Sequence, residues 1–257
     1  MRQRRVTGIE ERLAPYADLI LRGTSRLLVA SSPSLLAIRD AEKDGPPESL
    51  VAGEASRYLR WYQRTSPRYL LPGGFRRVYA EFGCGRGLFI NTMAAEDPEG
   101  LYIGIEGCKT IVIRGLQKTR AAALENVRYI DAFVNDAEAA FGEGTLAGVF
   151  LNFSDPWPKE RHAERRLTAP AKAASYFITL APGGFVSVKT DGEEFFNYSL
   201  AAFTNAGFVI AGAACDIATV VSGVDIAERA AGTPTEYELK FRALGKPIYQ
   251  FTAVKGR

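Results

Sequence analysis

A carboxylate, two prolines and an indole follow one apolar run of this chain. Residues 149–151 form the run, and residues 152–158 read Asn-Phe-Ser-Asp-Pro-Trp-Pro. The prolines fix the backbone φ and remove N–H donors, so we expect a stiff loop. An aromatic plane beside the carboxylate of Asp155 suits a flat, nitrogen-rich ligand such as a nucleobase. The segment alone equally fits a structural corner, since Asp before Pro is a common turn and Trp157 is typical of a core.

A glycine-rich segment provides a second candidate site. Residues 81–87 read Glu-Phe-Gly-Cys-Gly-Arg-Gly. Gly83, Gly85 and Gly87 permit a positive φ and let a ligand approach the backbone closely. The dinucleotide-binding pattern G-x-G-x-x-G/A requires a small residue at position 88, where this chain has leucine. The spacing therefore weakens a nicotinamide-binding interpretation.

Two acids narrow the choice of ligand. Glu81 precedes the first glycine, where a carboxylate would repel a pyrophosphate but suits a cation. Glu106 follows Gly87 by 19 residues and ends the next expected strand, where an acid binds ribose hydroxyls. Together they favour S-adenosylmethionine, which has a ribose and a cationic sulfonium amino acid but no phosphate.

From residue 76 onward the sequence predicts alternating strands and helices, which must position these side chains. This alternation predicts a Rossmann-like α/β fold with a mostly parallel sheet and helices on both faces. A final helix followed by one more strand matches the layout of nucleotide-binding methyltransferases, with seven strands in all. We expect the strands at 77–82, 101–105, 127–130, 147–153, 185–189, 208–214 and 248–254. We expect the helices at 88–95, 110–124, 170–180, 194–206 and 235–244.

The last predicted helix carries clear boundary signals. Thr235 and Glu238 fit a capping box, with Thr235 at the N-cap and Glu238 three residues later. Gly245 and Pro247 fit the end of the same helix.

The region before residue 76 lacks a clear period and is predicted to be a separate extension. A helix within 9–30 would be interrupted at Pro15 and Gly23, and 54–64 could form another. Pro72-Gly73-Gly74 marks the boundary. We therefore divide the chain into a basic N-terminal extension, 1–75, and a catalytic domain, 76–257.

Charge is distributed unevenly along the chain. Residues 1–77 carry 14 Lys and Arg against 8 Asp and Glu, whereas the remainder is slightly acidic. Such asymmetry fits an N-terminal arm that meets a polyanion, although a solvated charged surface is the plainer interpretation.

Cysteine spacing and hydropathy exclude several protein classes. The three cysteines, Cys84, Cys108 and Cys215, form no C-x-x-C pair, so we expect neither a disulfide framework nor a metal site. No apolar segment follows the basic start, and no apolar run reaches the length of a membrane span. We therefore expect a cytoplasmic protein.

With these parts in place, the chain resembles the bacterial tRNA (guanine-N7)-methyltransferase family from about residue 76 to 254. The most specific match is L-N-F-S-D-P-W-P-K-E-R-H-A-E-R-R-L at 151–167. Further matches are E-F-G-C-G-R-G (81–87), Y-I-G-I-E (102–106), V-I-R-G-L (112–116), N-V-R (126–128), L-A-P-G-G (180–184), K-T-D (189–191), T-E-Y-E-L-K-F (235–241) and G-K-P-I-Y (245–249).

The resemblance implies methyl transfer from S-adenosylmethionine to N7 of guanosine 46 in the variable loop of tRNA. It implies that Glu81, Glu106 and Asp155 line the cofactor and catalytic site, with Asp155 as the catalytic residue. It further implies that the substrate is contacted by Lys159, Asp191, Thr235, Glu236, Tyr237 and Glu238. Near this site we expect Arg161, Arg165 and Arg166 to meet tRNA phosphates rather than form only a solvated helix face.

The chain departs from the family at the acid that usually meets the adenine. That position falls on Phe133. Asp131 or Asp136 could substitute through a local shift, and we prefer Asp131 because it lies just past the expected strand. The usual K-K-R-H also reads K-E-R-H here, so Glu160 removes one positive charge.

Three alternative functions remain open at this point. Phe133 leaves room for a tRNA-binding protein that keeps the fold without turnover. A nicotinamide enzyme on a similar sheet is disfavoured by Leu88. A methyltransferase for another RNA or a small molecule is disfavoured by the D-P-W-P-K block.

Overall fold

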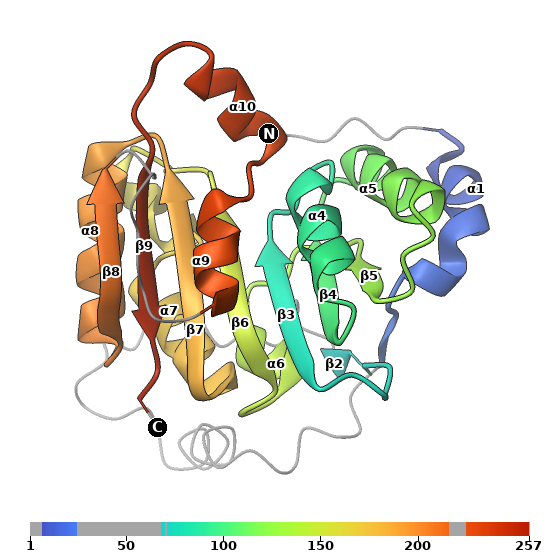
Figure 1. Ribbon diagram of the computed structural model, residues 1–257, viewed down its shortest axis with the longest axis horizontal. Helices are drawn as coiled ribbons and strands as arrows, with labels where there is room; N and C mark the ends of the chain where they lie inside the picture. Colours follow the sequence, from blue (N-terminus) through green and yellow to red (C-terminus); the bar gives the residue numbers. More distant parts are fainter. Residues whose placement is uncertain (1–6, 25–67, 70, 216–224, 257) are drawn as a thin grey trace.

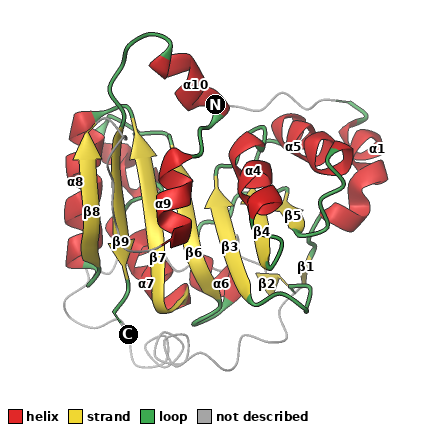
Figure 2. Cartoon of the chain, viewed as in Figure 1, coloured by secondary structure: helices red, strands yellow, loops and turns green. Residues whose placement is uncertain are grey.

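The computed structural model describes residues 7–24, 68–69, 71–215 and 225–256, and its centre is a seven-stranded sheet (Figures 1 and 2). Its strands are β3 (Arg77–Phe82), β4 (Gly100–Ile105), β5 (Val127–Ile130), β6 (Leu146–Asn152), β7 (Leu180–Thr190), β8 (Val209–Cys215) and β9 (Tyr249–Val254). They lie in the order β5-β4-β3-β6-β7-β9-β8. Strands β3 to β7 pair in parallel, and β9 runs antiparallel to both its neighbours. The predicted mostly parallel, Rossmann-like sheet is confirmed.

Helices cover both faces of this sheet, and each face has its own apolar cluster (Figure 1). One face is covered by α4 (Leu88–Glu96), α5 (Lys109–Ala121) and α9 (Asp225–Gly232). The other is covered by α6 (Ala137–Phe141), α7 (Pro170–Thr179) and α8 (Glu193–Asn205). The helix predicted at 110–124 ends earlier, at Ala121, because Ala123 takes a φ of 50°.

The first described residues pack against the edge of the sheet. The predicted break at Pro15 is confirmed, since α1 (Ile9–Leu13) gives way to the 3₁₀ helix η1 (Ala14–Leu19). Leu13, Leu19 and Ile20 are buried, and Ile20 bridges to Tyr129 of β5. These residues of the predicted N-terminal extension therefore contribute to the core.

Gly23 begins a short strand rather than continuing a helix. Strand β1 (Gly23–Thr24) pairs antiparallel with β2 (Arg68–Tyr69), a pair that sequence periodicity did not indicate. The helix expected at 54–64 lies outside the described residues.

Three further short elements were not predicted: α6, α9 and the 3₁₀ helix η3 (Glu160–Arg165). Helix α9 packs Ile226, Ala227 and Ala230 against the face that also carries α4 and α5. Such short apolar patterns are too brief to show a helical period.

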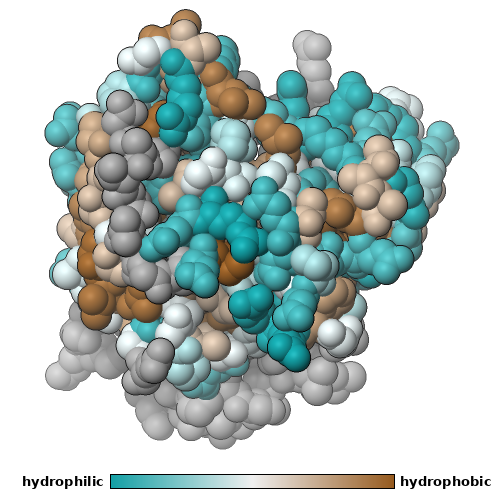
Figure 3. Space-filling view, viewed as in Figure 1, coloured by the Kyte–Doolittle hydropathy of each residue, from teal (hydrophilic) through white to brown (hydrophobic). Residues whose placement is uncertain are grey.

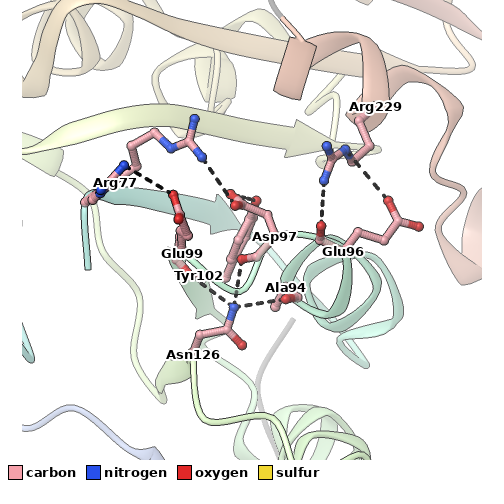
Figure 4. Close-up of polar contacts among 10 residues, drawn as sticks. Arg77, Ala94, Glu96, Asp97, Glu99, Tyr102, Asn126 and Arg229 are labelled. Atoms are coloured by element: carbon pink, nitrogen blue, oxygen red, sulfur yellow. Dashed lines mark hydrogen bonds and ion pairs between the residues drawn. The ribbon is translucent and has the colours of Figure 1, made fainter. Parts of the chain in front are cut away.

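A polar cluster fixes the turn between α4 and β4 (Figure 4). Asp97 accepts hydrogen bonds from the Tyr102 hydroxyl at 3.0 Å and from Arg77 Nη2 at 3.3 Å. Asn126 Nδ2 lies 2.9 to 3.0 Å from the carbonyl oxygens of Ala94, Asp97 and Gly100. Asp97, Tyr102 and Asn126 are buried, so they stabilise the amino-terminal end of the sheet, whereas the loops that carry the candidate site lie at the opposite end.

Helix α10 (Glu236–Arg242) lies beyond the carboxyl ends of the parallel strands (Figure 1). The space-filling view shows apolar side chains gathered over it (Figure 3). Leu239 is 51% exposed, and Leu244, just after the helix, is 63% exposed. This helix and its N-cap, Thr235, carry four of the six residues expected to contact the substrate.

Candidate active site

Four adjacent strands of the sheet end at the same edge and carry the acids singled out in the sequence. Glu81 lies near the end of β3, Glu106 follows β4, Asp155 follows β6 and Asp191 follows β7. In open α/β sheets, ligands bind at this carboxyl edge. The fold therefore brings together side chains that are more than 100 residues apart in the chain.

The glycine segment forms the turn between β3 and α4. Gly83, Gly85 and Gly87 all have positive φ, at 80°, 55° and 73°. A Cβ at Gly85 would meet nothing within 4 Å, whereas a Cβ at Gly87 would lie 2.7 Å from Tyr129 Oη. Gly87 is thus required by packing, and Gly85 leaves open space beside the backbone.

Glu81 is a buried carboxylate that is only partly satisfied by the protein. Its Oε1 accepts a hydrogen bond from Asn152 Nδ2 at 2.9 Å. Among the described residues, neither Glu81 Oε2 nor Asn152 Oδ1 has a hydrogen-bond partner. Burial raises the pKa of Glu81 to about 8. When Glu81 is ionised, its Oε2 and Asn152 Oδ1 are two buried, unpaired acceptors, which are costly unless a donor meets them, and an ammonium group provides three donors.

Asn152 was not identified from the sequence as a site residue. It ends β6, in the same L-N-F-S-D-P-W-P block that carries Asp155. Its position at a strand end beside polar residues was the available signal, but only the fold places it next to Glu81.

Glu106, which follows the neighbouring strand β4, stabilises the glycine turn through a hydrogen bond. Its Oε1 accepts from the Cys108 backbone N–H at 2.8 Å, and its Oε2 accepts from the Gly85 N–H at 3.2 Å. Burial raises the pKa of Glu106, and the nearby charge of Asp155 adds to the effect. Each oxygen keeps a further lone pair, so the carboxylate can also accept hydrogen bonds from ribose hydroxyls.

Asp131, the preferred replacement for the adenine-binding acid, lies between two cations. Its carboxylate oxygens are 3.6 Å from Arg22 Nη1 and 3.6 Å from Lys109 Nζ. The second candidate, Asp136, is buried and accepts from the Ala139 N–H and the Ser175 hydroxyl, so it caps α6.

Phe133 remains 66% exposed at the same edge. A Cβ at Gly107 would lie 2.4 Å from the Phe133 ring, so the ring rests on the backbone directly after Glu106. An aromatic surface therefore stands beside the acid expected to bind the ribose.

The Asp155 loop leaves β6 in an unusual conformation. Phe153 and Trp157 have positive φ, at 50° and 40°. Asp155 itself is exposed. Its charge contributes to the raised pKa of Tyr237 as well as of Glu106, after the larger effects of burial and, for Tyr237, of Asp191. Asp155 therefore lies near both Glu106 and α10.

Helix α10 begins as the sequence predicted. Thr235 Oγ1 accepts from the Glu238 N–H at 2.9 Å, which confirms Thr235 as the N-cap. The Glu238 carboxylate does not complete the reciprocal box, because it binds Lys189 Nζ at 3.0 Å and Arg242 Nε at 2.8 Å. Lys189 was not identified beforehand as a partner of Glu238.

The other residues predicted to bind the substrate differ in how many contacts they make with the rest of the protein. Glu236 forms an ion pair with Lys118, whose Nζ also donates to the Arg86 carbonyl at 2.9 Å, so α10 is tied to the glycine turn. Tyr237 is 41% exposed, and its hydroxyl lies 3.4 Å from Asp191 Oδ2. Lys159 is exposed immediately before η3.

The arginines after Asp155 fall into two groups. Arg161 and Arg165 are exposed, and Arg165 Cζ lies 5.2 Å from the centroid of the Trp157 ring. Arg166 instead donates hydrogen bonds to the Pro156 and Trp157 carbonyls. Its guanidinium is therefore committed to the loop, which differs from its predicted contact with phosphate.

Within the described ranges, neither a metal-ligand cluster nor a membrane-spanning helix is present. No group of three or more His, Cys, Asp or Glu side chains there has a metal-binding arrangement. No helix in those ranges is both long and apolar enough to cross a membrane.

Known proteins resemble this chain over most of its length. A family model described as "Putative methyltransferase" matches residues 76–251. The tRNA (guanine-N(7)-)-methyltransferase of Geobacillus thermodenitrificans is 36% identical over 211 residues, covering 81% of this chain and 90% of that protein. The enzyme of the same name from Bacillus subtilis is 36% identical over 178 residues, covering 69% and 80%.

Solved structures agree on the fold. The 16S rRNA methyltransferase KamB superimposes with a TM-score of 0.53 at 15% identity, covering 75% of this chain and 98% of that one. An antibiotic-related methyltransferase gives a TM-score of 0.51 at 20% identity, covering 72% and 90%. Both are methyltransferases by title, and at these identities they establish the fold alone. The extent and identity of the sequence matches settle the family: this chain belongs to the tRNA (guanine-N7)-methyltransferases.

Proposed function

We propose that this protein transfers the methyl group of S-adenosylmethionine to N7 of guanosine 46 in the variable loop of tRNA. The observation that carries the proposal is the placement of Glu81, Glu106 and Asp155 at the ends of three adjacent strands. We place the reaction in the cytoplasm, where tRNA is processed.

The residues at this edge fit the cofactor. The unpaired acceptors of Glu81 and Asn152 suit its ammonium group, and Glu106 suits its ribose hydroxyls. Gly85 leaves open space for the ligand beside the turn. When bound, the cofactor supplies an electrophilic methyl group on a sulfonium. Asp131 and the Phe133 ring are our candidates for contacts with the adenine.

The chain's own contribution to the reaction is mainly positional. Guanine N7 has an in-plane lone pair and no proton, so no general base is required, and alignment with the sulfur–methyl bond is the main task. As positive charge passes to the purine, the Asp155 carboxylate stabilises it. Asp191 and Tyr237 flank the approach, and Lys159 and the exposed arginines provide cations for phosphate. Glu238 is held by Lys189 at the base of α10.

The test uses purified protein, S-adenosylmethionine and a tRNA that lacks 7-methylguanosine. Digestion and mass spectrometry should find 7-methylguanosine, and fragment mapping should place it at position 46. A matched tRNA with adenosine at position 46 should remain unmodified. Product in that control, or methylation of another atom, would contradict the proposed substrate position.

A single variant tests the role of Asp155. We expect Asp155→Asn to reduce kcat by about 100-fold or more, because the carboxylate charge is lost while the side-chain shape is kept. Cofactor affinity and thermal stability should stay near those of the unmodified protein, since Asp155 is exposed. Near-normal turnover would remove Asp155 from the catalytic role.

A further inference from the structure

The loop that carries Asp155 departs twice from the backbone conformations that L-residues prefer. Phe153 and Trp157, on either side of the acid, both have positive φ. Conformations of this kind are strained for L-residues and persist only where surrounding contacts determine them. The position of Asp155 therefore depends on whatever holds the loop.

Arg166 makes the contacts that hold it. Its Nε donates to the Pro156 carbonyl at 2.8 Å, and its Nη2 donates to the Trp157 carbonyl at 3.1 Å. The two carbonyls belong to the two residues that follow Asp155. A planar guanidinium can bind both at once, whereas an ammonium is a point donor without that geometry.

The same guanidinium is anchored from the other side. Its Cζ lies 4.2 Å from the centroid of the Tyr198 ring, and Tyr198 belongs to α8, a helix packed on the sheet. Stacking of this kind is favourable for arginine. The guanidinium thus connects the strained loop to a rigid element of the fold.

We propose that Arg166 is a positioning residue for methyl transfer, which fixes the direction of Asp155 by binding the two carbonyls that follow it. The proposal rests on the role of Asp155 proposed above. It separates Arg166 from Arg161 and Arg165, which are exposed on the same segment and donate no hydrogen bond to the Pro156 or Trp157 carbonyl.

The experiment compares steady-state kinetics of Arg166→Ala, Arg166→Lys and Arg161→Ala with tRNA as substrate. We expect Arg166→Ala to lower kcat by roughly 10- to 100-fold, because small misplacements of a catalytic group have effects of this size. Its KM for tRNA should change by less than about threefold. Arg166→Lys should recover little of kcat, since one ammonium cannot replace the planar fork. Arg161→Ala should instead raise KM.

Loop order is measured independently by Trp157 fluorescence. The sequence contains two tryptophans, so Trp61→Phe makes Trp157 the sole reporter. In that background Arg166→Ala should increase quenching by acrylamide at least twofold. Arg76→Ala, an 81% exposed arginine side chain at the opposite edge of the sheet, is the matched control and should change neither quenching nor kcat.

Three results would overturn the proposal: unchanged kcat in Arg166→Ala, a change confined to KM for tRNA, or full recovery in Arg166→Lys. Asp155→Asn, assayed in parallel, distinguishes the two proposals. If Asp155→Asn is inactive and Arg166→Ala is normal, only the positioning role fails. If Asp155→Asn is active, the role of Asp155 fails first.

Discussion

Lys189 and Glu238 form an ion pair, with 3.0 Å between Nζ and Oε2, and both side chains are almost completely buried. Lys189 also donates to the Thr233 carbonyl at 2.8 Å, and the second oxygen of Glu238 accepts from Arg242. These contacts join β7 to the segment that precedes α10 and to the first turn of the helix. The helix that covers the candidate site is therefore attached through charges that water does not reach.

Removing one partner of this ion pair should strongly destabilise the fold. We expect Lys189→Met to lower the free energy of unfolding by about 3–5 kcal/mol, because Glu238 is left as a buried charge with only the partly exposed Arg242 beside it. Urea denaturation monitored by circular dichroism measures this change. Adding Glu238→Gln to Lys189→Met should recover part of the stability, since the buried charge that has lost Lys189 is removed.

The control for this prediction is Lys240→Met, on the exposed side of the same helix. It should alter the free energy of unfolding by no more than about 0.5 kcal/mol. If Lys189→Met were equally mild, the ion pair would not be what attaches α10.

Alanine substitutions at Gly87 and Gly85 should distinguish a glycine that is required for packing from one that is required for cofactor binding. We expect Gly87→Ala to be the more destabilising change, because its Cβ would lie 2.8 Å from Gly115 Cα and 2.7 Å from Tyr129 Oη, neither of which can easily retreat. Gly85→Ala places its Cβ in open space, so only the backbone cost of positive φ applies, about 1–2 kcal/mol. It should nevertheless weaken cofactor binding, since we propose that the ligand approaches through that space.

Gly183→Ala provides the comparison for Gly85→Ala. Gly183 also has positive φ and open space around its Cβ, but it lies in the exposed first part of β7. Thermal melting should show similar losses for both variants, and calorimetry should show weaker cofactor binding for Gly85→Ala alone. Equal cofactor affinity in the two would contradict the assigned approach.

The sequence was informative where a physical signal was local. Thr235 was identified as an N-cap because its hydroxyl and the following acid stand at fixed offsets, and the sheet strands were identified because buried parallel strands are continuously apolar. The glycine turn was identified for the same reason, since its residue types are required by its backbone conformation.

The remaining features depend on contacts that no local pattern records. Asn152 meets Glu81 because β6 lies beside β3, and Lys189 meets Glu238 across 49 residues of chain. Arg166 was expected to meet phosphate because it lies next to the proposed site in the sequence, whereas the carbonyls it binds are presented only by the folded loop. The roles of Asp131 and Phe133 at the adenine stay predictions.

Cofactor binding should release a proton from Glu81. Burial holds the pKa of this carboxyl at about 8 in the protein without ligand, so at pH 7 most molecules carry the proton there. A bound ammonium favours the ionised form and lowers the pKa. The affinity for S-adenosylmethionine should therefore rise with pH, by up to about tenfold per unit, and level off above about pH 8.

Calorimetry at pH 7 in buffers of different ionisation enthalpy should show about one proton released. Glu81→Gln, which keeps the shape but cannot ionise, should bind more weakly and show neither the pH dependence nor the proton release. A wild-type affinity that is flat from pH 6 to 8 would mean that Glu81 does not meet the ammonium group.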